Sequence, residues 1–170
     1  MTVPEKAFHS EAGKYRITDA YRPIARALLD KYPELSHIDP DRMLFVENVE
    51  SHGMSKGKPR LACTRRVPEM WFEIVRQLTG RKFDYVIEFF RVNTLGLSRA
   101  QLVAVIYHEL KHIGPDGQLV AHDLEDWGEM VATLGPGWYL PEAQIPDPLQ
   151  DGFDWTRLQP DVLPGMGPGN

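Results

Sequence analysis

The stretch His108-Glu109-Leu110-Lys111-His112 decides how this chain is interpreted. Its two histidines are four positions apart, so on an α-helix they lie one above the other on the same face. Two imidazoles at that spacing can share one metal ion, and the glutamate after the first histidine can reach a water bound to that ion. The stretch therefore predicts a zinc site on a helix, with Glu109 as the general base of a hydrolase.

The residues before this motif predict a capped helix. Ser98 is a favourable N-cap residue, and Gln101 follows it at the spacing of a capping box. Apolar residues then recur at mixed three- and four-residue intervals until Gly114-Pro115, where the helix should end. Burying two histidines and a glutamate on such a helix is costly unless they have partners, and a metal ion would satisfy both imidazoles at once.

A third ligand is expected downstream, because a catalytic zinc usually has three protein ligands and one position for water. The turn Gly114-Pro115-Asp116-Gly117 reverses the chain, and His122 follows ten residues after the second motif histidine. We predict His122 as the third ligand, with Asp123, Glu125 and Glu129 as alternatives. Asp123 is also a candidate for the carboxylate that accepts a hydrogen bond from a ligating imidazole.

The stretch from about Tyr21 to Tyr139 resembles the putative phage metallopeptidase family of bacteriophage and prophage genomes. The resemblance rests on Tyr107–Ile113, on His122–Trp127 and on the strand-like Phe83–Phe89. It implies an α+β, minimal zincin-like domain, similar in outline to SprT-like and ImmA-like peptidases. In such folds the edge strand before the motif helix lines the cleft, which makes Phe83–Arg91 the expected binding strand for an extended peptide.

The resemblance also implies roles for individual residues. His108, His112 and His122 would hold a zinc ion, and Glu109 would be the general base for the zinc-activated water that attacks a peptide bond. The activity of the family is itself inferred from its motif, so the resemblance supplies no substrate. The chain departs from the metzincin pattern, because no histidine lies six residues after His112 and no convincing Met-turn follows.

Composition limits the remaining possibilities. A chain of 170 residues with an ordinary globular composition fits one domain with a real core. No apolar run approaches the roughly 20 residues needed to cross a bilayer, and Met1–Lys6 lacks the apolar region of a signal peptide. The single cysteine, Cys63, cannot form an internal disulfide and is interpreted as a buried structural thiol. We therefore expect no membrane partner and a cytoplasmic location in a bacterial host.

Three parts of the chain differ in composition. Residues 1–16 are a polar lead-in, 17–140 form the expected metallopeptidase domain, and 141–170 are an acidic tail rich in proline and glycine. Helices are expected over 18–31, 68–78, 98–113 and 124–134, and strands over 43–49, 60–66 and 83–92. This order predicts a short, mostly antiparallel sheet packed on the motif helix. The tail would wrap the domain through Phe153, Trp155 and Leu158, or tether a partner.

One local basic stretch bears on the choice of partner. Five cations, Lys56, Lys58, Arg60, Arg65 and Arg66, lie within eleven residues and could contact phosphate. A solvated hairpin is the commoner explanation for such a stretch. Three functions therefore remain open: a zinc endopeptidase acting on protein or peptide substrates, a non-catalytic zinc-binding regulatory or interaction module, and a DNA-associated protease similar to SprT-like proteins.

Overall fold

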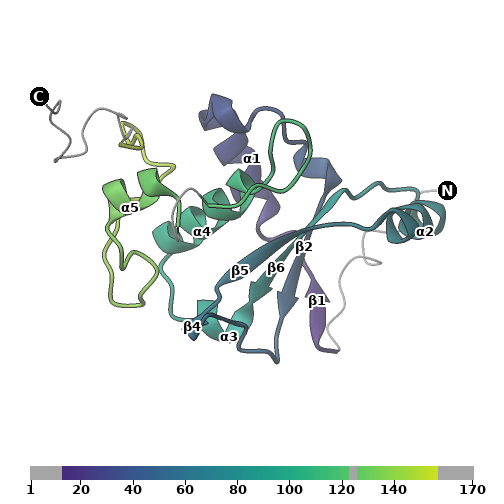
Figure 1. Ribbon diagram of the computed structural model, residues 1–170, viewed down its shortest axis with the longest axis horizontal. Coiled ribbons are helices and arrows are strands. Elements are labelled where there is room, and N and C mark those ends of the chain that lie inside the picture. The colour runs from purple at the N-terminus through teal and green to yellow at the C-terminus, as the bar shows by residue number, and fades with distance from the viewer. Residues whose placement is uncertain (1–12, 123–125, 157–170) are drawn as a thin grey trace, which may run out of the picture.

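The computed structural model describes residues 13–122 and 126–156, which form a small α+β domain. In chain order the elements are β1 (Tyr15–Ile17), α1 (Arg22–Lys31), the 3-10 helices η2 (Pro33–Leu35) and η3 (Pro40–Arg42), β2 (Met43–Asn48), β3 (Met54–Ser55), β4 (Lys58–Pro59), β5 (Ala62–Arg66), α2 (Glu69–Thr79), β6 (Tyr85–Phe90), α3 (Arg91–Thr94), α4 (Arg99–Lys111) and α5 (Gly128–Leu134). Helices α1 and α4 lie on the same side of the main sheet, and α2 lies beyond the end of the sheet that is farther from α5 (Figure 1). The expected fold class is confirmed.

The main sheet has four strands in the order β1-β2-β6-β5. The pairs β1–β2 and β5–β6 are antiparallel, whereas β2–β6 is parallel, so the sheet is short and mostly antiparallel as predicted. The prediction that Phe83–Arg91 forms the edge strand is wrong. Strand β6 lies within that range, and it is paired on both sides by β2 and β5. The edge strand beside the motif helix is β5.

The motif helix α4 begins as the sequence predicts. The Ser98 side chain accepts a hydrogen bond from the backbone N–H of Gln101, and the Gln101 side chain accepts one from the backbone N–H of Ser98. Gln101 is fully buried, and its amide also donates to the carbonyls of Trp138 and Leu140 at 2.9 and 2.6 Å. One side chain therefore fixes both the first turn of α4 and the chain that follows α5.

The hydrophobic core lies between the sheet, α1 and α4. On α4 the side chains from Val103 to Tyr107, together with Leu110, are at most 2% exposed. From α1, Leu28 is fully buried, and the Tyr21 ring just before that helix stacks on Phe89 with ring centroids 4.0 Å apart. Helix α4 is therefore enclosed on most of its surface, which fixes the position of the motif residues at its end.

The described part of the tail packs on this core. Trp155 is buried and stacks on Tyr107, with ring centroids 4.4 Å apart. The Tyr32 hydroxyl donates to the carbonyl of Pro148 at 2.5 Å, which joins the segment to the end of α1. Phe153 lies edge-on to Trp155. The expected wrapping contacts of these two aromatic residues are therefore present, and Leu158 lies outside the described residues.

Six short elements have no counterpart in the sequence prediction: β1, β3, β4, α3 and the 3-10 helices η2 and η3. Strand β1 lies partly within the expected lead-in, and strands β3 and β4 form a small hairpin between the strands expected over 43–49 and 60–66. A strand of two or three residues is too short to show the alternation by which strands are recognised. Helix α5 begins at Gly128, later than predicted, and residues 123–125 lie outside the described part of the chain.

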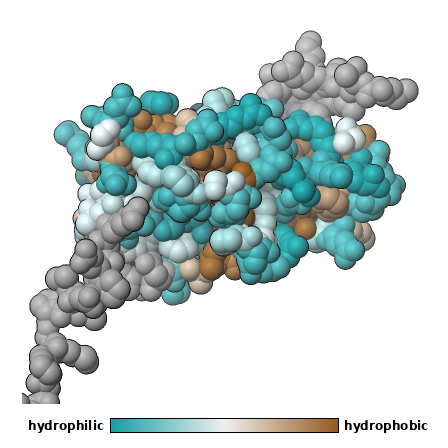
Figure 2. Space-filling model, turned by 90° about the horizontal axis from the view of Figure 1, so that it is seen from above, coloured by the Kyte–Doolittle hydropathy of each residue, from teal (hydrophilic) through white to brown (hydrophobic). Residues whose placement is uncertain are grey.

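Among the described residues, no helix is both long and apolar enough to cross a membrane. Seen from above, the described surface is mainly hydrophilic, with hydrophobic side chains gathered in separate patches (Figure 2).

Candidate metal centre

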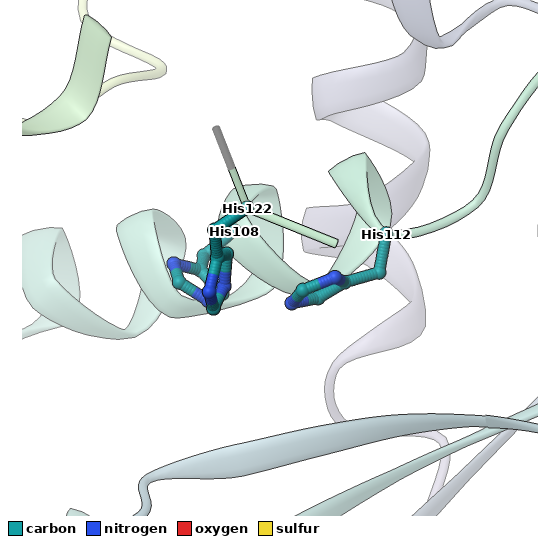
Figure 3. Close-up of side chains that lie close together, drawn as sticks. All are labelled: His108, His112 and His122. Atoms are coloured by element: carbon teal, nitrogen blue, oxygen red, sulfur yellow. The ribbon is translucent and has the colours of Figure 1, made fainter. Parts of the chain in front are cut away.

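Three histidines converge at the end of α4. His108 lies in the last turn of the helix, His112 is its C-cap residue, and His122 belongs to the segment that returns toward the helix (Figure 3). One ring nitrogen from each histidine lies within 4.8 Å of the others. The Nε2 atoms of His108 and His122 are 2.8 Å apart. The structure therefore brings together all three histidines that the sequence singles out.

The turn after α4 explains how His122 reaches the helix. The backbone N–H of Gly114 donates to the carbonyl of Gln118, and Gly117 adopts the left-handed conformation that favours glycine, with φ +75°. The chain then runs back along the helix end, where the N–H of Val120 donates to the carbonyl of His112 at 2.8 Å. The carbonyl of Val120 lies 2.7 Å from Nδ1 of His112. This contact turns the other ring nitrogen of His112 toward the cluster.

Asp126 orients the first motif histidine. Its Oδ1 lies 2.9 Å from Nδ1 of His108, and its Oδ2 accepts a hydrogen bond from the Trp138 indole at 2.8 Å. Burial alone would raise the pKa of Asp126, but the contacts with His108, Trp138 and the backbone of Trp127 outweigh burial, and the pKa is lowered. A carboxylate beside Nδ1 of His108 favours the tautomer that carries its hydrogen on Nδ1, which leaves Nε2 directed at the other histidines.

The sequence missed the role of Asp126. Three carboxylates, Asp123, Glu125 and Asp126, follow His122 within four residues, and the residue pattern gives no reason to prefer the third. Asp123, which was expected in this role, lies outside the described residues, as does Glu125. Asp126 is distinguished from the other two carboxylates by its contacts with Trp127 and Trp138 in the folded protein. Spacing along the chain does not reveal these contacts.

Glu109 lies beside the edge strand of the sheet. It is only 4% exposed, and the Thr64 hydroxyl on β5 lies 2.7 Å from its Oε2 atom and 2.9 Å from its backbone carbonyl. A hydroxyl has one hydrogen, so at any moment it donates to one of these two acceptors. No feature of the sequence pointed to Thr64. The contact joins the second residue of the motif to the strand that borders the cleft.

Glu129 lies away from the histidines. Its Oε1 accepts a hydrogen bond from the Tyr107 hydroxyl at 2.8 Å and forms an ion pair with Lys111. Burial of the ring and the nearby charge of Glu129 both raise the pKa of Tyr107. Glu129 is therefore part of a polar group that ties α5 to α4, and the structure does not bring it to the three histidines.

The chemistry of the donor set fits a transition metal. Imidazole nitrogen is a favoured ligand of Zn²⁺, and three histidines are one of the ligand sets of catalytic zinc. Oxygen acceptors beside Nδ1 of His108 and of His112 leave the opposite nitrogens directed at the cluster. In the described part of the chain, no other group of three histidine, cysteine or acidic residues is placed to hold a metal ion.

The three histidines and Glu109 line one cleft. It has a volume of about 1090 Å³, at the upper end of the range of small-molecule and substrate sites. Strand β5 contributes Ala62, Cys63 and Thr64 to its lining. The cleft can therefore bring a ligand to the histidines along the edge of the sheet.

Comparison with known proteins identifies the family. The model of the putative phage metallopeptidase family matches residues 14–155, which include the sheet, α4 and all three histidines. A search of curated proteins and a search of solved structures found no significant match. Since the family model covers well over half of the chain, the protein belongs to the putative phage metallopeptidase family.

Proposed function

We propose that the protein is a zinc-dependent endopeptidase that acts on polypeptide segments inside the bacterial host cell. The observation that supports this proposal is the convergence of His108, His112 and His122 beside Glu109 in one large cleft. The family membership supports a metal-dependent peptidase in general terms. The identity of the metal and the roles of the residues are part of the proposal.

The residues have distinct roles in this mechanism. His108, His112 and His122 hold the metal. When bound there, zinc supplies a Lewis acid that makes a water molecule acidic enough to lose a proton near neutral pH. Glu109 takes that proton and later delivers it to the leaving amine of the substrate. Thr64 contacts one oxygen of the Glu109 carboxylate, which would hold the carboxylate in place and leave the other oxygen to take the proton.

The substrate backbone would pair with β5. Among the described strands, only β6 pairs with β5, so the outer edge of β5 has no partner strand there. An extended peptide can add to such an edge through main-chain hydrogen bonds. Thr64, in the middle of β5, contacts Glu109, so a peptide on this edge passes the proposed base. This arrangement gives β5 the role that the sequence assigned to Phe83–Arg91.

The proposal is tested by metal analysis and peptide digestion. We expect protein purified without a metal-binding tag to contain about one zinc ion per chain. It should cleave peptides of a proteome-derived library, detected by mass spectrometry. A chelator should stop this cleavage, and added zinc should restore it. Protein that neither contains nor takes up zinc would overturn the proposal, and zinc-loaded protein that cleaves no peptide would indicate a non-catalytic zinc-binding module.

Thr64→Val is expected to lower kcat about tenfold and to leave KM and zinc content nearly unchanged. The replacement keeps the size of the side chain and removes the hydroxyl that donates to Glu109, and a hydrogen bond to a charged group contributes about 1.5–3 kcal/mol. Thr64→Ser keeps the hydroxyl and should stay close to the wild-type rate. Steady-state kinetics on a library-derived peptide, with zinc analysis of each variant, measures this effect. Equal rates for the valine and serine variants would show that the hydroxyl does not position Glu109.

A further inference from the structure

The lining of the metal-centre cleft is divided between apolar and cationic residues. Many of its apolar side chains come from α5 and from the segments before and after that helix: Leu119, Val120, Val131, Pro136, Trp138 and Tyr139. The cations Lys56, Lys58 and Arg60 come from the β3–β4 hairpin and the residue that follows it. The two acids in the described lining, Glu109 and Asp126, belong to the metal centre. Away from that centre, the charged side chains of the described lining are all positive.

The basic stretch recognised in the sequence is divided by the fold. Arg65 forms an ion pair with Glu88, and Arg66 donates to the side chain of Gln118 at 3.1 Å. Because neighbouring strand residues point to opposite faces, Arg65 and Thr64 lie on opposite sides of the sheet. These two arginines are engaged in contacts within the fold. The other three cations of the stretch line the cleft, where Lys58 and Arg60 also contact other groups of the protein.

The base of the hairpin is firmly attached to the domain. The side-chain amide of Asn93 donates to the carbonyls of His52, Gly53 and Arg60, at 2.6, 3.2 and 2.8 Å, and so holds both legs of the hairpin. The backbone N–H of Arg60 donates to the carbonyl of Gly53 at 2.9 Å. A Cβ atom added to Gly53 would lie 2.5 Å from the Phe90 ring, so the two segments are in close contact. The cations are therefore held at a defined place beside the sheet.

The tip of the hairpin is a tight turn that carries one of the cations. Lys56 and Gly57 both have positive φ, +49° and +77°, and Ser55 pairs with Lys58 across the turn. Two successive residues with positive φ are typical of the type I′ hairpin turn. Asparagine, aspartate or glycine is usual in the place of Lys56. The hairpin thus has a lysine at a position where the left-handed backbone conformation disfavours that residue.

The hairpin comes directly before the proposed substrate strand along the chain. Only Arg60 and Leu61 separate β4 from β5, so a peptide paired with β5 runs on past the hairpin. Thr64, which contacts Glu109, is four residues from Arg60 along the chain. At about 3.3 Å per residue, the hairpin cations begin roughly 13 Å from the proposed base. A substrate side chain that meets them is therefore about four or more residues from the scissile bond.

We propose that the β3–β4 hairpin is a recognition arm that selects polypeptide segments with acidic side chains about four or more residues to one side of the scissile bond. The inference rests on the proposed peptidase function, because β5 is taken as the substrate strand. A peptide is favoured over a nucleic acid because peptide main-chain groups can pair with the open edge of β5. The cations would then pair with the carboxylates of the same segment.

Binding of two matched peptides tests the charge preference without turnover. The protein is the zinc-loaded Glu109→Gln variant, and the probes are fluorescent decapeptides, (Glu-Ala)₅ and (Gln-Ala)₅, followed by fluorescence anisotropy. Exposed ion pairs contribute up to about fivefold each, so we expect the glutamate peptide to bind about five- to tenfold more tightly. The preference should fade near 1 M salt, where screening acts over about 3 Å. Adding Lys56→Gln and Lys58→Gln should remove most of it.

A matched control separates the hairpin from the overall charge of the protein. Lys14→Gln with Lys82→Gln makes the same change in net charge at exposed positions that do not line the cleft, and it should keep the preference. Digestion of a proteome-derived library by the active protein gives a second readout. Aspartate and glutamate should be enriched on one side of the cleavage site in wild type, and the enrichment should disappear in the hairpin variant while cleavage continues.

The outcomes separate this inference from the proposed function. Cleavage without acidic enrichment, together with equal binding of the two decapeptides, overturns the hairpin proposal alone. A protein that takes up no zinc and cleaves nothing overturns the peptidase proposal, and the anisotropy comparison, then made on the metal-free Glu109→Gln variant, still decides whether the hairpin selects acidic peptides. Tight, salt-sensitive binding of a DNA duplex with no discrimination between the decapeptides overturns the proposal in favour of the nucleic-acid partner.

Discussion

Glu109→Gln is expected to lower kcat by about 10³-fold and to leave zinc content and thermal stability unchanged. A positioned general acid or base contributes roughly 10²- to 10⁴-fold, and Glu109 is proposed to serve as both in turn. Glutamine is close in size to glutamate and can still accept the hydrogen bond of Thr64, so the packing at 4% exposure is preserved. Its amide cannot take a proton from water. Initial rates on a library-derived peptide, with zinc analysis of the same sample, measure the effect.

The control for this experiment is a carboxylate outside the cleft. Glu69→Gln, in the exposed first turn of α2, removes the same charge and should keep wild-type kinetics. Glu109→Asp keeps the carboxylate but shortens its reach, so an intermediate rate is expected. A Glu109→Gln variant that retains rates within about tenfold of wild type would show that another group transfers the proton.

His122→Ala is expected to weaken zinc binding by more than about a hundredfold. Loss of a group that merely supports a ligand usually costs 10- to 100-fold in metal affinity, so the loss of a ligand should cost more. The remaining His108 and His112 would still lie on one helix face but would form an incomplete site. Competition with a chromophoric chelator measures the affinity. Added zinc should raise the unfolding temperature of wild type, since ligand binding stabilises the folded state, and should not raise that of the variant.

A second histidine serves as the matched control. His52→Ala removes an exposed imidazole that does not line the cleft, and zinc affinity should stay at the wild-type value. Wild-type affinity in His122→Ala would mean that another residue completes the site. Asp123 and Glu125 would then be tested first, because the Glu129 carboxylate is engaged by Tyr107 and Lys111.

The features that could be predicted from the sequence are those that local chemistry determines. The capped helix α4 followed from Ser98, Gln101 and the uninterrupted apolar run, and the spacing of His108 and His112 placed them on one face. The return of His122 followed from the turn that begins at Gly114, because such a short connection keeps the chain near the helix end. In each case the deciding residues lie within about a dozen positions of one another.

The features that were missed depend on contacts between distant segments. Strand β6 lies inside the sheet because it pairs in parallel with β2, about forty residues earlier. Its closeness to the motif helix along the chain does not show which strand lies at the edge of the sheet. Thr64 reaches Glu109 across 45 positions. Asp126 was one of several neighbouring carboxylates, and the packing of Trp138 against it singles it out. Such contacts can be identified only when the strand order and the packing of the helices are known.

The open edge of β5 also bears on how the protein behaves at high concentration. Unpaired backbone groups along a strand are templates for pairing with another copy of the same chain, which is how many sheets begin to aggregate. Strand β5 is five residues long and ends in Arg65 and Arg66, both exposed. Short length and charged side chains on an edge are the features that disfavour such pairing. The strand is thereby kept open with a reduced tendency to form intermolecular sheets.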